Sequence, residues 1–188
     1  NDSGSISDVN ITISGSESCD IEYLDITLQS PYGTIVELFN IGTLSGKAFY
    51  QTIFDSQADI PIDEGVAPYF GTYRPIGDLS SFNGEEINGD WLLVVYHNQG
   101  CNSEIADWSL NIEYDSNNDG ETSDYLGDIY QGDSFEVSPD NITVGTLNIN
   151  DSGSISDVNI TISGSESCDI EYLDITLQSP YGTIVELF

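Results

Sequence analysis

The side chains best suited to chemistry are oxygen ligands in one acidic stretch, residues 115–128. Its first half reads DSNNDGE, which fits the opening of a calcium loop: oxygen ligands alternate with other residues, and a glycine makes a sharp turn. Hard cations such as calcium prefer these carboxylate and amide oxygens. We therefore expect a calcium (Ca2+) site, with the candidate ligands Asp115, Asn117, Asp119, Glu121, Asp124 and Asp128.

This loop is not an EF-hand, because its twelfth position holds Leu126 where an EF-hand has a glutamate. Asp124 or Asp128 would have to close the ligand shell instead. An ordinary turn rich in Asn, Asp and Gly is the alternative interpretation of the same residues. If calcium binds, we expect it to turn a self-repelling acidic linker into a fixed joint between domains.

The cysteines form a second candidate site. Residues 150–188 repeat residues 1–39 letter for letter, so Cys168 is the counterpart of Cys19. We expect Cys168 to pair with a cysteine beyond this sequence, which leaves Cys19 and Cys101 as the two cysteines of one unit. An even count fits one disulfide in an oxidising, extracellular compartment. Two buried free thiols are the alternative.

Catalysis has little support in the sequence. His97 is the only histidine, so a Ser-His-Asp arrangement would depend on one residue with no supporting motif. Lys47 and Arg74 are the only basic residues, which leaves no clamp for a phosphate or another anion. We expect that the chain is not an enzyme.

The charge excludes further classes of partner. Acidic residues number 33 against two basic ones, for a net charge of -31. Such a surface repels nucleic acid and anionic membranes, and it attracts divalent cations. No apolar run is long enough to span a membrane. Solubility or adaptation to salt is the alternative explanation of the acidic surface.

The elements that must position these residues are predicted to be strands. Alternating apolar and β-branched residues are separated by turn signals and show no helical period. This pattern predicts an all-β fold, an antiparallel jelly-roll-like β-sandwich, with Trp91 and Trp108 in its core. The predicted strands cover residues 6–13, 21–28, 34–39, 48–54, 91–96 and 108–114.

The unchanged repetition sets the domain organisation. Its offset of 149 residues is longer than one small structural repeat, so it indicates a tandem array of whole domains. The second copy stops at Phe188 in mid-pattern, and we therefore expect a longer protein. Identical copies suit a spacer or a multivalent surface better than an active site.

A series of short motifs now resembles a known family. GSISDVNI at residues 4–11 and LDITLQSPYGT at 24–34 are similar to the opening motifs of the P domain, the β-sandwich beside the catalytic domain of proprotein convertases. Similar domains occur in secreted bacterial proteases and surface proteins. Further matching motifs follow in the family's order at residues 71–75, 79–84, 89–95 and 108–112.

The resemblance implies where the domains begin. P domains open one strand earlier, and that strand corresponds here to residues 135–149, just before the second copy. We therefore expect a body at 1–114 without its opening strand, an acidic linker at 115–133 and the start of the next repeat at 134–188. The alternative is that residues 135–149 fill a neighbour's sheet by donor-strand exchange.

The resemblance also bears on the cysteines. Loops at one end of the family's sandwich can hold calcium, and here Cys19 and Cys101 occupy the first and last of these loops. The resemblance thus implies that a Cys19–Cys101 disulfide replaces an ionic clip, and no calcium ligand is carried over from the family.

These observations favour a non-enzymatic repeat of a long extracellular cell-surface filament or adhesin, of the kind that serves gliding motility. Repetition adds reach and multivalent attachment without new contacts. The expected partners are neighbouring identical repeats or subunits, and surface glycans or another cell-surface protein. The alternatives are an accessory P domain that stabilises or targets a secreted subtilisin-like protease, and a carbohydrate-binding module.

Overall fold

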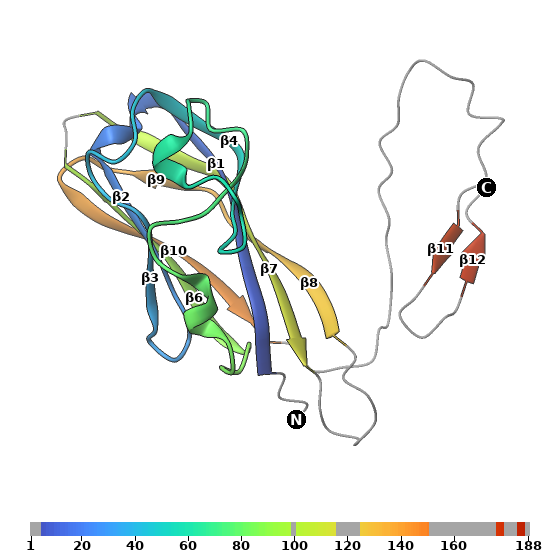
Figure 1. Cartoon of the computed structure of the whole chain (residues 1–188). Helices are drawn as coiled ribbons and strands as arrows, with labels where there is room; N and C mark the ends of the chain where they lie inside the picture. The colour runs from blue at the N-terminus through green and yellow to red at the C-terminus, as the bar shows by residue number, and fades with distance from the viewer. Residues whose placement is uncertain (1–4, 99–100, 116–124, 151–175, 179–183, 187–188) are drawn as a thin grey trace, which may run out of the picture. The chain divides into compact units, whose positions relative to one another are not determined.

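A computed structural model describes residues 5–98, 101–115, 125–150, 176–178 and 184–186. Most of these residues form two sheets that pack face to face (Figure 1). The first sheet has the order β5 (Gly71–Tyr73), β4 (Lys47–Phe54), β1 (Ser5–Asp20), β7 (Ser103–Asp115) and β8 (Tyr125–Gly132), with β9 (Phe135–Val137) also paired to β7. The second has the order β10 (Asn141–Ile149), β6 (Gly89–His97), β2 (Leu24–Gln29) and β3 (Ile35–Phe39).

Neighbouring strands run antiparallel, apart from the short parallel pair of β4 and β5. Three single-turn 3-10 helices at Ile21–Tyr23, Ile62–Glu64 and Leu79–Phe82 lie in the connections. The all-β sandwich that the sequence predicts is therefore confirmed. Residues 21–23, expected as the start of a strand, form one of these helical turns instead.

Alternation along the strands builds the core. Every second residue of β6 is buried, from Trp91 to His97, and β2 buries Leu24, Ile26 and Leu28 in the same way. Both tryptophans are fully buried, as predicted. Their indole N–H groups donate to backbone carbonyls, at 3.0 Å for Trp91 and 3.1 Å for Trp108, so burial leaves neither donor unsatisfied.

The first compact unit spans Asn1–Ser152 and so extends past the expected boundary at residue 134. β8 pairs with β7 from Trp108↔Gly132 to Asp115↔Tyr125, which places half of the expected linker inside the sandwich. β10 pairs with β6 over nine residue pairs and completes the second sheet. The strands on either side of residues 116–124, β7 and β8, are therefore neighbours in one sheet.

The second unit, Gly153–Phe188, is described only at β11 (Thr176–Gln178) and β12 (Ile184–Glu186). These strands pair with Thr176 opposite Glu186 and Gln178 opposite Ile184. Their counterparts in the first copy, β2 and β3, pair with the same register, Thr27 opposite Glu37 and Gln29 opposite Ile35. The repeated sequence thus forms the same hairpin in both copies.

Candidate functional site

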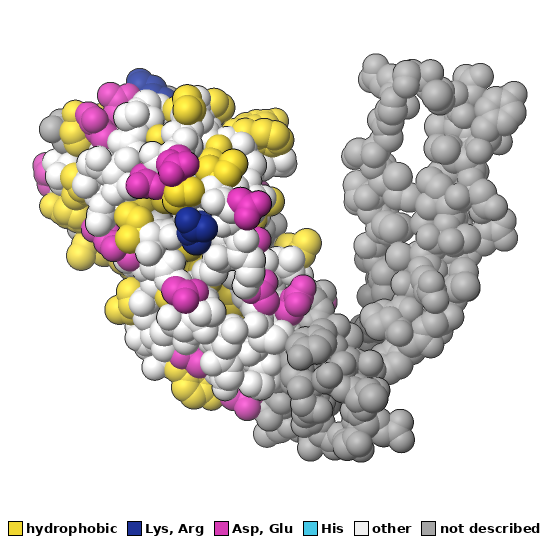
Figure 2. Space-filling model, in the orientation of Figure 1, with side chains coloured by type: hydrophobic (Ala, Val, Ile, Leu, Met, Phe, Trp, Pro, Cys, Tyr) yellow, Lys and Arg dark blue, Asp and Glu magenta, His cyan; other side chains and the backbone are white. Residues whose placement is uncertain are grey.

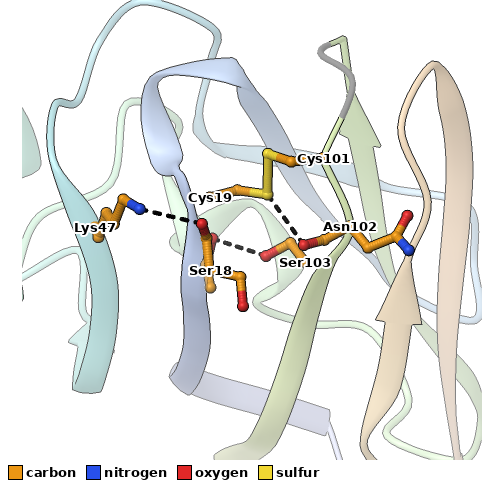
Figure 3. Close-up of a disulfide and its surroundings, with 7 residues drawn as sticks. Ser18, Cys19, Lys47, Cys101, Asn102 and Ser103 are labelled. Atoms are coloured by element: carbon orange, nitrogen blue, oxygen red, sulfur yellow. Dashed lines mark hydrogen bonds between the residues drawn. A yellow bond between two sulfur atoms is a disulfide. The ribbon is translucent and has the colours of Figure 1, made fainter.

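A disulfide joins the end of β1 to the segment just before β7, at one end of the sandwich (Figure 3). Cys19 is the penultimate residue of β1, and Cys101 lies two residues before β7. Their Cα atoms are 6.2 Å apart, and 82 residues separate them along the chain. The expected Cys19–Cys101 bond is therefore present, and its buried Cys19 end is almost inaccessible to solvent, with 1% exposure. Cys168 lies outside the described residues.

Gly15 allows β1 to approach β7 closely enough for this bond. Its φ of +147° is one that other residues rarely adopt, and a Cβ atom built there would lie 2.3 Å from the carbonyl oxygen of Glu104. Just beyond it, the buried Ser103 hydroxyl donates to the Ser16 hydroxyl at 2.9 Å. A glycine and a buried hydroxyl pair thus bring the two cysteines to the same place.

Two close contacts flank the bond (Figure 3). The ammonium group of Lys47 donates to the carbonyl oxygen of Ser18 at 3.1 Å, which ties β4 to the end of β1. The sulfur of Cys19 lies 3.0 Å from the carbonyl oxygen of Asn102. A disulfide sulfur carries no hydrogen, so this second approach is a packing contact.

The imidazole of His97 is buried beside the disulfide. His97 is the last residue of β6 and is fully buried, and within the described part of the chain neither ring nitrogen has a hydrogen-bond partner. A ring nitrogen of His97 and the sulfurs of Cys19 and Cys101 lie within 4.8 Å of one another. Burial lowers the pKa of His97, while the negative charge of Asp140 acts in the opposite direction.

Of the described residues, these three form the one cluster of metal-ligating side chains. Two thiolates and an imidazole are ligands that zinc accepts. With the sulfurs bonded to each other, the cluster offers one imidazole and no thiolate. In this form the cluster is a disulfide cross-link beside a buried histidine whose lowered pKa favours the neutral imidazole.

The candidate calcium residues are only partly described. Asp115 ends β7, and Asp128 lies within β8, whereas Asn117, Asp119, Glu121 and Asp124 lie outside the described residues. Asp128 pairs with Ile112, three residue pairs or about 10 Å along the ribbon from Asp115. Its carboxylate accepts a hydrogen bond from the Tyr114 hydroxyl at 3.1 Å. The strand pairing therefore sets Asp128 apart from Asp115.

The contact between the buried imidazole of His97 and the disulfide was not predicted from the sequence. The signal was present in the alternation of WLLVVYH, because Trp91, Leu93 and Val95 share one face with His97. A histidine at the end of such a face is expected to point into the core.

Removal of the disulfide should destabilise the first unit. We expect the double substitution Cys19→Ser and Cys101→Ser to lower the free energy of unfolding by about 4–5 kcal/mol, because the bond closes a loop of 82 residues in the unfolded chain. Urea unfolding at fixed pH measures the difference. Addition of a dithiol should weaken the wild-type chain and leave the double variant unchanged; equal midpoints for both proteins would contradict a stabilising bond.

The stability should also depend on pH through His97. Its folded pKa lies below the unfolded value of about 6.5, so the unfolded state takes up a proton first and stability falls as the pH drops from 8 to 5.5. In His97→Leu this contribution disappears, which changes the slope by at most about 1.4 kcal/mol per pH unit. Carboxylates titrate in both proteins, so their difference isolates His97. Identical slopes would show that the imidazole is accessible to protons in the folded state.

Comparison with known proteins identifies the family of this sandwich. The proprotein convertase P-domain family matches residues 6–112, a range that begins in β1 and ends in β7 and contains both disulfide cysteines. Comparisons with curated proteins and with solved structures gave no match. Since the match covers more than half of the 188 residues, the chain belongs to the proprotein convertase P-domain family.

Proposed function

We propose that this chain is a non-enzymatic structural repeat of a long extracellular cell-surface filament or adhesin. The observation that carries the proposal is the unchanged repetition of residues 1–39 at 150–188. In the first copy this stretch contains all of β1, β2 and β3, so what is repeated is a large part of a sandwich. A second identical sandwich adds reach and another point of attachment.

The chemistry of the site supports a structural role. His97 is the only histidine of the chain, and it is buried among core residues and a disulfide, away from any open surface. Of the three cysteines, Cys19 and Cys101 are bonded to each other. Among the described residues, His97 and Cys19 are thus buried in the sandwich, with Cys101 bonded to Cys19.

The surface supports an extracellular setting. A disulfide and membership of a family found in secreted convertases are both consistent with an extracellular protein. Acidic and apolar side chains are interspersed over the face shown in Figure 2, with few basic ones. Among the described residues there is no helix that is long and apolar enough to cross a membrane. The partners we propose are neighbouring repeats, surface glycans or a surface protein.

Exposed aromatic side chains offer one place for such attachment. The rings of Tyr50 and Phe70 lie 5.9 Å apart, with 59% and 64% of each residue exposed, and Val66 on the adjoining loop is 78% exposed. Apolar side chains this exposed contribute little to the core and are common in contacts with partners. They favour a protein or glycan ligand on the β4–β5 side of the body.

A second candidate function is an accessory domain of a secreted protease. The match to the proprotein convertase P-domain favours it, because that domain accompanies a catalytic domain. In that setting the sandwich would stabilise or target a catalytic domain in the same protein. The unchanged repeat has no explanation under this second function, which is why we rank it below the first.

Immunogold electron microscopy of intact producing cells separates the two functions. Antibodies raised against the folded chain should label fibres on the cell surface at regular intervals, because each repeat presents the same epitope. Peptidase activity should not co-purify with the fibres that the antibody labels. Label confined to a soluble secreted peptidase would contradict the filament and support the accessory domain.

Calcium binding in the loop from Asp115 to Asp124 is part of this proposal. Extracellular calcium modules bind with dissociation constants of about 0.1–1 mM. At ten times that constant, one site adds about 1.4 kcal/mol of stability, or about 3–6 °C in Tm. Thermal melting in calcium and in EDTA measures this shift, with Mg2+ and the variant Asp119→Ala as controls. An equal Tm in all four conditions would mean that the loop binds no calcium.

A further inference from the structure

The strand β10 fills a fitted slot beside β6. It pairs with β6 along its whole length, from Asn141↔His97 to Ile149↔Gly89. Leu147 and Ile149 are buried in the core. Gly145 lies so close to Phe135 of β9 that a Cβ atom there would stand 2.3 Å from the ring. The body therefore needs a strand of this sequence to complete its second sheet.

The end of β10 and the start of β1 lie against the same short segment. Ile149 pairs with Gly89, and Ser5 forms a bridge with Glu86. The backbone N–H of Ile6 donates to the carbonyl oxygen of Glu85 at 2.8 Å. Since the Cα atoms of Glu86 and Gly89 can be at most about 11 Å apart, the strand that fills the slot ends close to where β1 begins.

The sequence provides the matching connection in the next copy. The four residues after Ile149 are Asn150–Gly153, and they are identical to Asn1–Gly4, which precede β1. The five peptide links from Ile149 to Ser154 reach about 17 Å when extended, which is on the scale of the separation between Ile149 and Ser5, because each of these two residues lies about 5 Å from its partner in the segment from Glu86 to Gly89. The strand 141–149 can therefore complete either of two bodies: the one that precedes it, as observed, or one whose β1 follows it.

From this ambiguity we propose that β10 is exchanged between copies, so that the strand of one copy fills the slot beside β6 in another. The inference rests on the proposed repeat function and names the partner, a second copy of this chain. The acceptor slot and the strand are the same residues in every copy, so exchanged and unexchanged pairings make the same contacts. They differ in chain connectivity and in the copy that donates the strand.

A short hinge allows this exchange. Ser138, Pro139 and Asp140 connect β9 to β10, and Asp140 has a φ of +56°. β9 pairs with β7 in the first sheet, whereas β10 pairs with β6 in the second. A change of direction at these three residues would redirect β10 while β9 stays in place. Backbone pairing at a sheet edge supplies affinity for such a donated strand.

The test uses two variants of the full chain, each with Cys168→Ser. One carries Leu92→Cys in β6 and the other carries Thr146→Cys in β10, residues that lie opposite each other. The two proteins are unfolded in urea without reductant, mixed, refolded and oxidised mildly. Exchange predicts a disulfide-linked dimer of one chain of each variant, at twice the 20.5 kDa mass, and its yield should rise with protein concentration.

A matched control separates exchange from random collision. Ile142→Cys lies on the same strand but opposite Tyr96, four residue pairs or about 13 Å from Leu92. Its mixture with Leu92→Cys should give several-fold less dimer than the in-register mixture. A double variant with Leu92→Cys and Thr146→Cys in one chain reports whether the slot is filled at all.

Equal dimer yields from the in-register and out-of-register mixtures would overturn the exchange, provided that the double variant closes its bond within one chain. That result leaves the proposed surface function intact, because the labelling of cells does not depend on which copy donates the strand. Conversely, the in-register dimer together with label on a soluble peptidase would contradict the filament function and support the exchange of β10.

Discussion

The pairing of one strand with the edge of β6 is the constraint on which the rest of the body depends. Without β10, β6 would present a row of unpaired backbone groups along nine residues, and the core around Trp91 would lose the cover of Leu147, which lies opposite it. In a β-sandwich the inward face of each sheet must be covered along its whole width, so a missing strand leaves core residues exposed. Either the same copy or another copy of the repeat could therefore supply this strand.

The disulfide end of the sandwich depends on the same strand. Asn141 pairs with His97, and the backbone N–H of Asp140 donates to the carbonyl oxygen of His97 at 2.7 Å. The start of β10 is thereby hydrogen-bonded to the backbone of the residue whose imidazole lies beside Cys19 and Cys101. Burial of the imidazole lowers the pKa of His97, and the charge of Asp140 opposes this shift only in part. The start of β10 and the disulfide therefore lie at the same end of the sandwich.

Local patterns predicted much of this fold and could not predict its boundaries. Alternation in residues such as those of β2 and β6 revealed the strands and the buried tryptophans, because a residue's face is a local property. The strand β8 was missed because YLGDIYQG interrupts its apolar residues with glycines and an aspartate. β10 was recognised as a strand, yet its partner was not, because the same sequence fits the body before it and the body after it. The disulfide was predicted from the cysteine count of one unit and from the family resemblance, whereas the position of His97 beside it depends on how the strands pack.

Identical neighbouring domains usually carry a hazard, since equivalent strands compete for equivalent slots and can join the wrong body. In this chain the competing segment would be β10, which can make the same contacts with β6 of its own copy or of another copy. Self-repulsion from a net charge of -31 opposes general association of copies, so a specific ladder of backbone hydrogen bonds stands out against it. Under the proposed exchange, a strand that passes from one body into the next turns this hazard into a connection. The sheet edge of β6 would then join neighbouring bodies through the same backbone pairs that close one body in the observed fold.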